Sequence, residues 1–322
     1  MSQARIFITR RITAEAMRLM ESVAEVVVWQ GEDPPSYARL CEESSHSDGL
    51  LTMLTDRIDK ALIEASPLLK VISQMAVGYD NIDLDAAKAH QIKVGHTPGV
   101  LTETTADLAW ALLMATARRI VESDAEVRQG IWRAWGPFVL CGQDIHGATL
   151  GIIGMGRIGQ AMARRANGFG MRILYHDLRP ERAIESQTGA VFTPLNDLLT
   201  QSDFISLHTY LSPETFHMIS APQFDLMKPT AIIINTSRGA VVDSTALLDA
   251  LTNGKIAAAG LDVFDPEPIP LDHPILKLKN VVVTPHIASA SIHTRSIMAM
   301  MSAENIVAGL SGLPLPYSVP GM

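Results

Sequence analysis

Cysteine is scarce in this sequence, because only Cys41 and Cys141 occur among 322 residues. Two thiols about a hundred residues apart provide neither a disulfide framework nor the spacing of a metal site. Long hydrophobic runs are also missing, since no stretch approaches the ~20 apolar residues that cross a bilayer. We therefore expect an unprocessed cytoplasmic protein with ordinary thiols, no bound metal and no membrane partner.

Positively charged residues are fewer than negatively charged ones. The chain has 26 Lys and Arg against 34 Asp and Glu, which gives a net charge of −8. Binding to nucleic acid requires clustered cations that face phosphates, so we expect no nucleic-acid partner. Small anionic substrates remain compatible with this balance through local cations. With 47% hydrophobic and 19% charged residues, the composition is that of a globular protein.

The length suggests two domains, because a common domain has about 150 residues. Short runs rich in Ile and Val alternate with helical patterns, which is typical of βαβ units and parallel sheets. A first series of runs precedes residue 100. A second series predicts six strands from Thr149 onward, at 150–153, 173–175, 204–207, 231–234, 257–261 and 281–284. Between the two series, the pattern from Thr104 to Gln129 predicts one long helix.

Two proline-bearing segments indicate where the chain crosses between the domains. The first is HTPGV at 96–100, and the second is Pro285 after the last predicted strand. The final helix, at about 291–310, would then return to the N-terminal domain. We therefore predict one discontinuous domain of residues 1–98 and 287–322, and a second domain of residues 99–286.

A glycine-rich loop follows the first strand of the second series. It reads Gly154-x-Gly156-x-x-Gly159 and opens a helix, and the acidic Asp177 stands eighteen residues beyond Gly159. This arrangement is the dinucleotide-binding fingerprint: the glycines allow a tight turn, close approach of the pyrophosphate and close packing of helix on strand. The helix N-terminus faces the phosphates. The loop therefore predicts a Rossmann-type, doubly wound sheet that binds a dinucleotide cofactor.

Asp177 bears on the choice of cofactor. A carboxylate at the end of the second strand accepts hydrogen bonds from the adenosine ribose and repels a 2′-phosphate, which favours NAD over NADP. Arg179 and Arg182 follow it and could turn toward a phosphate, so NADP remains an alternative.

Further motifs resemble the D-isomer-specific 2-hydroxyacid dehydrogenases over the whole chain, most of all the glyoxylate/hydroxypyruvate reductases. They are VGYDNID (77–83), TPGVLTETTAD (97–107), INTSRGAVVD (234–243), AAAGLDVFDPEP (257–268) and TPHIASAS (284–291). The resemblance implies a dinucleotide-binding domain inserted into a flavodoxin-like α/β substrate-binding domain. It also implies hydride transfer between a nicotinamide cofactor and a small 2-oxo or 2-hydroxy acid.

Three residues are expected to carry the chemistry. Arg238 follows a strand at the carboxyl end of the sheet, where its planar guanidinium can hold a carboxylate and polarise the adjacent carbonyl oxygen. Glu267 stands between two prolines, and His286 follows Pro285. A carboxylate bonded to imidazole stabilises the protonated ring, so His286 can donate a proton to the carbonyl oxygen. The resemblance assigns these three roles to Arg238, Glu267 and His286.

The resemblance assigns the remaining site residues as well. Backbone amides near Val77 and Gly78 should bind the substrate carboxylate. Asp262 should meet the nicotinamide carboxamide, Thr105 should reach the nicotinamide end, and His208 should lie near the adenosine. The expected cofactor contacts are completed by Arg157, Ile158 and Thr236.

Two segments deserve comparison with the family. The chain reads His208-Thr209-Tyr210-Leu211 where relatives generally have His-x-Pro-Leu, which leaves the adenine-side wall and the cofactor choice less determined. The segment WRAWGPFVLCGQDIHG at 132–147 resembles the dimerisation arm of the reductases, here taken as about 130–147. The resemblance implies a homodimer in which Trp135 reaches the neighbouring active site; core packing of Trp135 is the alternative.

Other functions compatible with the motifs are less favoured. Formate dehydrogenases pair the histidine with Gln, whereas Glu267 stands here, and phosphite dehydrogenases have Lys where this chain has Val77. A dinucleotide-sensing corepressor would share the same motifs without turnover. Oxidation of NADH by glyoxylate separates an enzyme from such a binding protein.

Overall fold

The computed structural model describes residues 3–322, which form two compact units. Unit 1 runs to Leu101 and resumes at Ala290–Met322, and unit 2 is Thr102–Ser289. None of the helices in the described part of the chain is both long and apolar enough to cross a bilayer.

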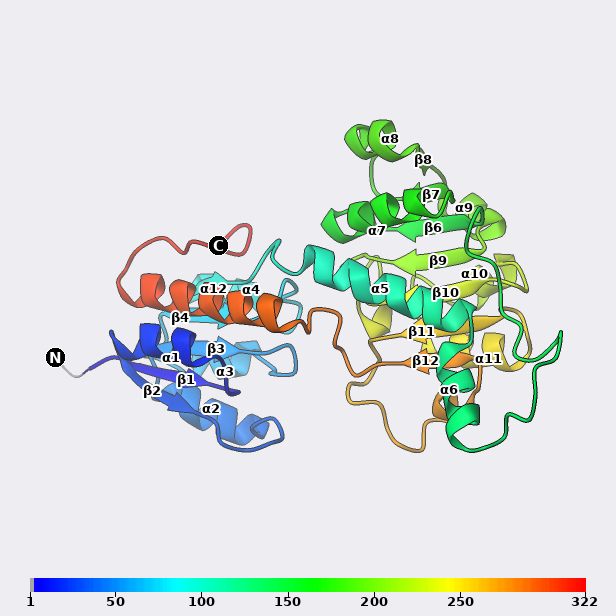
Figure 1. Ribbon diagram of the computed structural model, residues 1–322. Coiled ribbons are helices and arrows are strands. Elements are labelled where there is room, and N and C mark those ends of the chain that lie inside the picture. The colour runs from blue at the N-terminus through cyan, green and yellow to red at the C-terminus, as the bar shows by residue number, and fades with distance from the viewer. Residues whose placement is uncertain (1–2) are drawn as a thin grey trace. The chain divides into compact units, whose positions relative to one another are not determined.

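Unit 1 is built on a five-stranded parallel sheet in the order β2-β1-β3-β4-β5, the flavodoxin-like order (Figure 1). Its strands are β1 (Arg5–Ile8), β2 (Glu25–Val28), β3 (Gly49–Thr52), β4 (Val71–Gln74) and β5 (Lys93–Gly95). Its helices are α1 (Ala14–Glu21), α2 (Tyr37–Ser45), α3 (Lys60–Glu64), α4 (Leu84–Ala89) and α12 (Ile292–Leu310). The last helix, α12, packs on α1 and on the central strands β3 and β4.

Unit 2 is built on a seven-stranded parallel sheet in the order β12-β11-β10-β9-β6-β7-β8. Its strands are β6 (Thr149–Ile153), β7 (Arg172–His176), β8 (Val191–Phe192), β9 (Phe204–Leu207), β10 (Ile232–Asn235), β11 (Ala258–Leu261) and β12 (Val281–Val283). From β6 onward the order is that of a doubly wound dinucleotide-binding sheet. The predicted α/β fold class, with two parallel sheets, is confirmed.

Helices cover both faces of the unit 2 sheet. They are α5 (Thr102–Ala117), α6 (Ile120–Arg128), α7 (Arg157–Gly168), α8 (Arg182–Thr188), α9 (Leu195–Gln201), α10 (Ala221–Leu226) and α11 (Ser244–Thr252), with 3-10 turns at Gly239–Val241 and Pro274–Lys277. Successive strand residues point to opposite faces. Ile232 and Ile234 therefore pack in the core with α5 and α7, while Ile233 packs in the core with α9, α10 and α11. This double burial explains why the strands consist of continuous apolar runs.

Two local predictions for unit 2 were wrong. The predicted single helix from Thr104 to Gln129 is divided into α5 and α6, and Arg119 between them has a left-handed φ of +53°. The carbonyl of Ala117 accepts a hydrogen bond from the amide of Gln143 (2.8 Å), a partner distant in sequence that takes the place of the next helical turn. The sheet also has seven strands rather than six, because the two-residue strand β8 is too short to produce a pattern.

Candidate active site

The glycine loop leaves β6 and enters α7, and each glycine has a different steric surrounding. Gly154 has φ +94°, and a Cβ there would lie 2.7 Å from the backbone of His208. A Cβ on Gly159 would lie 2.1 Å from the carbonyl oxygen of Gly154. Both positions therefore require glycine. Gly156 differs, because a Cβ built on it would meet no atom within 4 Å.

The N-terminus of α7 fits the pyrophosphate of a dinucleotide. Gly156 is the N-cap of this helix of 12 residues, and no side chain caps it. The first amides of a helix point out of its N-terminus, and its dipole favours negative charge there. Arg157 and Ile158 form the first turn, with Arg157 exposed and Ile158 half-buried. The open space at Gly156 and the uncapped helix end would together hold a phosphate group.

Asp177 is fixed beside this loop at the end of β7. One carboxylate oxygen accepts the amide of Met155 (2.6 Å), and the other accepts the amide of Leu178 (2.6 Å). The two nearby arginines face acidic side chains instead. Nε of Arg179 lies 3.6 Å from Oε1 of Glu181, and Nη1 of Arg182 lies 2.8 Å from Oε2 of Glu185.

His208 follows β9 and is a neutral imidazole. Its Nε2 is hydrogen-bonded to the hydroxyl of Ser206 at 2.8 Å. Desolvation lowers the pKa of His208 to about 3, so the ring carries no charge at neutral pH. Tyr210, where the family usually has proline, is 69% exposed. The backbone of His208 packs against Gly154 of the glycine loop. The neutral ring has no acidic proton to supply near neutral pH.

The turn after β10 carries Arg238. Arg238 is half-buried, and its Nη1 donates to the carbonyl oxygen of Ser237 (2.9 Å). Thr236, two residues earlier, is only 7% exposed, and among the residues described its hydroxyl has no hydrogen-bond partner. A buried hydroxyl of this kind is suited to a bound ligand group. The turn thus offers a cation and an unsatisfied hydroxyl at one edge of the sheet.

Glu267 and His286 are in direct contact. Nδ1 of His286 lies 2.8 Å from Oε2 of Glu267, whose Oε1 accepts the amide of Phe264 (2.9 Å). Burial by itself would raise the pKa of Glu267. The hydrogen bond from His286, the amide of Phe264 and the charge of Arg238 outweigh burial and hold this pKa below its ordinary value. The carboxylate therefore stays ionised and fixes Nδ1, which leaves Nε2 as the ring nitrogen on the other side.

Asp262 organises the loop that carries His286. Its side chain is fully buried, and it accepts hydrogen bonds from the Thr284 hydroxyl (2.6 Å) and from the amides of Ile287 and Ala288 (both 2.8 Å). Its backbone carbonyl also accepts the amide of His286 (2.8 Å). Burial raises the pKa of Asp262 despite these bonds. The carboxylate thus bonds to the 284–288 loop, and its predicted contact with the nicotinamide stays a prediction.

The other predicted residues occupy varied surroundings. Val77 and Gly78 follow β4 in unit 1, where the carbonyl of Val77 lies 2.9 Å from Nδ1 of His96. Thr105 lies in α5 and is 4% exposed. Trp135 lies in the arm and is 83% exposed, so core packing of Trp135 within unit 2 is not observed. Among residues 3–322, no group of three or more His, Cys, Asp or Glu side chains is placed to hold a metal ion.

The structure thus brings Glu267 and His286 together and places Arg238 close enough to influence Glu267. Sequence reasoning missed Asn235, the last residue of β10, whose amide bonds to the Arg238 turn. Its signal was present, since a buried amide ends an otherwise apolar run and asparagine is depleted in strands.

Comparison with known proteins identifies the chain's relatives. Residues 110–288 match the family model described as "D-isomer specific 2-hydroxyacid dehydrogenase, NAD binding domain". A glyoxylate reductase of Korarchaeum cryptofilum is 54% identical over 305 residues, which are 94% of this chain and 92% of that protein.

Solved structures give the same result for the whole fold. A crystal structure of a Thermus thermophilus protein matches with a TM-score of 0.92 and 46% identity, covering 98% of this chain and 99% of that one. An NADPH-dependent glyoxylate/hydroxypyruvate reductase of Sinorhizobium meliloti, solved with NADP and malonate, matches with a TM-score of 0.88 and 33% identity. That match covers 99% of this chain and 97% of the other.

The open space at Gly156 gives a direct test of the cofactor site. In the Gly156→Ala variant the new methyl group meets no protein atom, so we expect thermal stability to stay at the wild-type value. The methyl group would occupy the space needed by the pyrophosphate, so NADH affinity should fall about tenfold or more, a cost of about 1.4 kcal/mol per factor of ten. Fluorescence titration with NADH and thermal unfolding measure the two effects.

Gly168→Ala is the matched control, because its added methyl also meets no atom within 4 Å but lies at the other end of α7. An unchanged NADH affinity in Gly156→Ala would place the cofactor phosphates elsewhere.

Proposed function

The chain belongs to the D-isomer-specific 2-hydroxyacid dehydrogenases, which are NAD(P)-dependent oxidoreductases, and on this basis we propose that it reduces small 2-oxo acids such as glyoxylate and hydroxypyruvate. The observation that carries the proposal is the Glu267–His286 hydrogen bond with Arg238 beside it. A proton donor and a cation at one sheet edge are what reduction of a carbonyl next to a carboxylate requires.

Substrate binding is assigned to Arg238 together with the Val77–Gly78 backbone. The guanidinium would hold the carboxylate and polarise the 2-oxo group, because its fork of N–H donors matches both oxygens. Amides of the turn at Val77 and Gly78 would hold the other carboxylate oxygen. The nicotinamide cofactor supplies the hydride when it is bound, and Thr105 and Thr236 are assigned to its nicotinamide side.

Proton transfer is assigned to His286. Glu267 holds Nδ1 and stabilises the protonated ring, so Nε2–H would be directed at the substrate oxygen. As negative charge develops on that oxygen, the proton moves from Nε2 to it and leaves the neutral imidazole. The ionised Glu267 then favours re-protonation of the ring for the next turnover. Asp262 would contribute by holding the 284–288 loop in place.

We assign NADH as the preferred cofactor. Asp177 holds its carboxylate beside the glycine loop through two backbone amides, where a ribose 2′-phosphate would meet a second anion. Arg179 and Arg182, the cations that would favour NADP, are oriented toward Glu181 and Glu185. Repulsion between the Asp177 carboxylate and a 2′-phosphate would destabilise bound NADP. With NAD, the same carboxylate would accept a hydrogen bond from the ribose.

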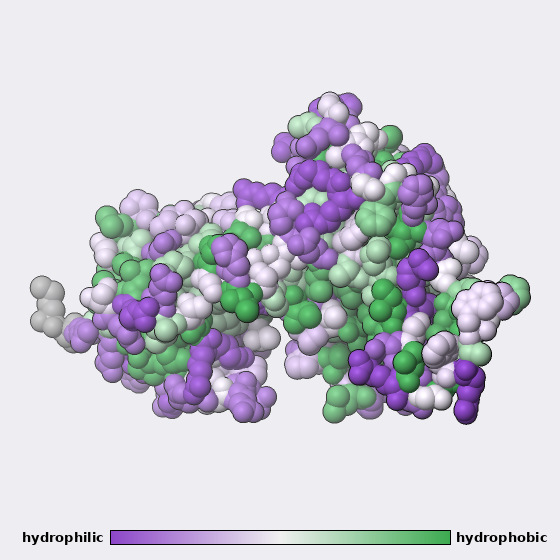
Figure 2. Space-filling model, viewed as in Figure 1, coloured by the Kyte–Doolittle hydropathy of each residue, from purple (hydrophilic) through white to green (hydrophobic). Residues whose placement is uncertain are grey.

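A homodimer is the proposed assembly. Helix α6 and the arm at about 130–147 expose many apolar side chains: Ile120, Val121, Val127, Ile131, Trp132, Trp135, Phe138 and Val139. The face drawn in Figure 2 shows hydrophobic residues among hydrophilic ones over the surface of this unit. A concentration of exposed apolar side chains in one segment of the chain favours a surface that is covered in the working assembly. A second copy would cover it, with Trp135 reaching toward the neighbouring active site.

A cytoplasmic location is proposed from the thiols. Cys41 and Cys141 are both free, and Cys141 is exposed. Free exposed thiols persist in a reducing compartment.

A steady-state panel of 2-oxo acids tests the reaction itself. Purified protein should oxidise NADH with glyoxylate and with hydroxypyruvate, and Arg238→Ala should lower kcat/KM by about a thousandfold because it removes both substrate binding and polarisation. The loss of NADH absorbance measures both. Failure of every acid with NADH and with NADPH would contradict the proposed reaction and favour a dinucleotide-sensing protein.

The cofactor preference is tested at Asp177. Wild type should have a higher kcat/KM with NADH than with NADPH, and Asp177→Ser should narrow or reverse that ratio because it removes the repelling carboxylate. Serine keeps an oxygen that can accept the amide of Met155, so the loop is retained. A wild-type preference for NADPH would mean that Arg179, Arg182 or the wall at Tyr210 overrides the carboxylate.

The Glu267–His286 pair is tested by pH. The Glu267 carboxylate, with its lowered pKa, is ionised across the working range and stabilises protonated His286. In Glu267→Gln that stabilisation is lost, so the protonated ring should persist only to lower pH. The alkaline limb of kcat/KM for reduction should therefore move to lower pH. A pH profile identical to wild type would remove Glu267 from proton transfer, and NADH affinity serves as the control that the site is intact.

A further inference from the structure

Asn235 is a buried amide that the proposed chemistry has not used. It is the last residue of β10 and is only 1% exposed. Its Oδ1 accepts hydrogen bonds from the amide and the hydroxyl of Ser237 (3.0 and 2.8 Å), and its Nδ2 donates to the carbonyl of Arg238 (2.8 Å). All three bonds thus go to the turn that the same strand leads into.

Such bonds define the conformation of a turn outside the sheet. After Asn235 the chain leaves the ladder, and β10 no longer supplies backbone partners. Asparagine side chains that bond to the backbone two or three residues on replace those partners and fix the turn. The bond to the Arg238 carbonyl therefore limits where the backbone of Arg238 can move, and the side chain starts from that fixed point.

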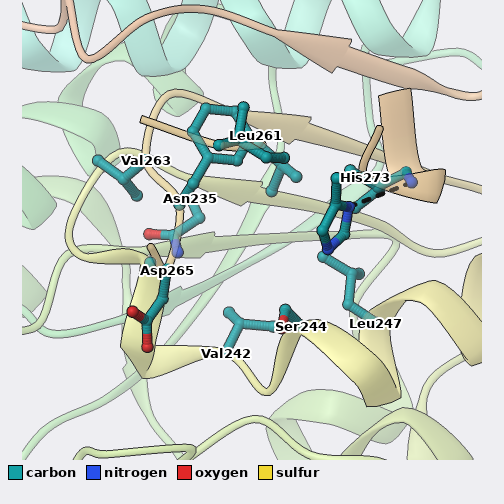
Figure 3. Close-up of a pocket in the computed structure, with 12 residues that line it drawn as sticks. Asn235, Val242, Ser244, Leu247, Leu261, Val263, Asp265 and His273 are labelled. Atoms are coloured by element: carbon teal, nitrogen blue, oxygen red, sulfur yellow. Dashed lines mark hydrogen bonds between the residues drawn. The ribbon is translucent and has the colours of Figure 1, made fainter. Parts of the chain in front are cut away.

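The same turn also touches the loop that holds Glu267. A Cβ on Gly239 would lie 2.0 Å from the backbone of Phe264, so the two main chains are in close contact at this point. The amide of Phe264 donates to Glu267. Figure 3 shows Asn235 and Asp265 at the small cavity of about 30 Å³ between these segments, with His273 opposite. Displacing the turn would therefore disturb the spacing between Arg238 and Glu267.

We propose that Asn235 is a positioning residue. Its side-chain amide fixes the turn, and the turn keeps Arg238 at a constant position relative to the Glu267–His286 pair. The inference rests on the proposed function, in which Arg238 binds the 2-oxo acid. Its contribution is geometric, because Asn235 itself touches neither substrate nor cofactor in this assignment. A shift of about 1 Å in such a group can reduce the rate on the order of a hundredfold.

Asn235→Asp separates positioning from general stability, because it keeps the shape and the acceptor oxygen. It replaces the N–H donor with an oxygen that faces the Arg238 carbonyl. When ionised, this oxygen repels the carbonyl; when protonated, it donates to it. The introduced acid would be buried near Asp262, Asp265 and Glu267, with Arg238 as the cationic group on the same turn. His273, on the facing segment, accepts the amide of Ile275 at its Nδ1 (3.3 Å). Burial and the three carboxylates favour protonation at mildly acidic pH.

The experiment measures kcat/KM for glyoxylate with NADH from pH 5 to 8.5 in wild type, Asn235→Asp and Asn235→Ala. We expect Asn235→Asp to lose about a hundredfold at pH 8, with NADH affinity within twofold of wild type. The ratio of its kcat/KM to that of wild type should rise at least fivefold toward low pH. The ratio for Asn235→Ala should stay flat, because alanine has no group to titrate. Ser237→Ala, which removes only one of the three bonds, is the mild control.

Hydrogen exchange of the segment 237–241 provides a readout that needs no turnover. At pH 8, the backbone amides of residues 237–241 should exchange faster in Asn235→Asp and Asn235→Ala than in wild type. The amides of β9 and β11 should exchange at the wild-type rate in both variants. A flat ratio for Asn235→Asp, or unchanged exchange in this segment, would overturn the inference. If wild type reduces no 2-oxo acid, the proposed function fails on its own, and the exchange data still decide whether Asn235 holds the turn.

Discussion

Parallel pairing of the seven strands in unit 2 gathers the residues of that unit which form the candidate site. Because all the strands run in the same direction, their carboxyl ends lie along one edge of the sheet, and each chain segment leaves the sheet there. The glycine loop follows β6, Asp177 follows β7 and His208 follows β9. Arg238 follows β10, Asp262 follows β11 and His286 follows β12. Residues more than a hundred positions apart thereby share one edge without any long-range bond being needed to gather them.

Within that arrangement, buried polar groups give the loops their shape. The fully buried carboxylate of Asp262 accepts three donors from the segment after β12, and the buried amide of Asn235 bonds to the turn after β10. Burying such groups costs free energy unless their hydrogen bonds are made. The loops therefore adopt the conformations that satisfy these groups, and Arg238 and His286 are carried along with them.

The sequence predicted what is local and periodic. Apolar runs predicted the strands, and the spacing of Gly154, Gly156 and Gly159 predicted the loop, because the close packing of Gly159 on the carbonyl of Gly154 lies within a single turn. The helix break at Arg119 was not predictable, since it depends on a bond between Ala117 and Gln143, whose partner no local pattern reveals. The orientation of the Asp262 carboxylate was not predictable for the same reason, because its three donors lie more than twenty residues away.

The close contact at Gly239 has a consequence for how this protein can change over evolutionary time. Any side chain there would push apart two main-chain segments, one leading to Arg238 and the other to Glu267. Neutral drift at that position is thereby blocked, since a single substitution would perturb both groups at once. Changes in substrate range must accumulate in side chains elsewhere around the site, and protein engineers who seek altered specificity should leave this glycine unchanged.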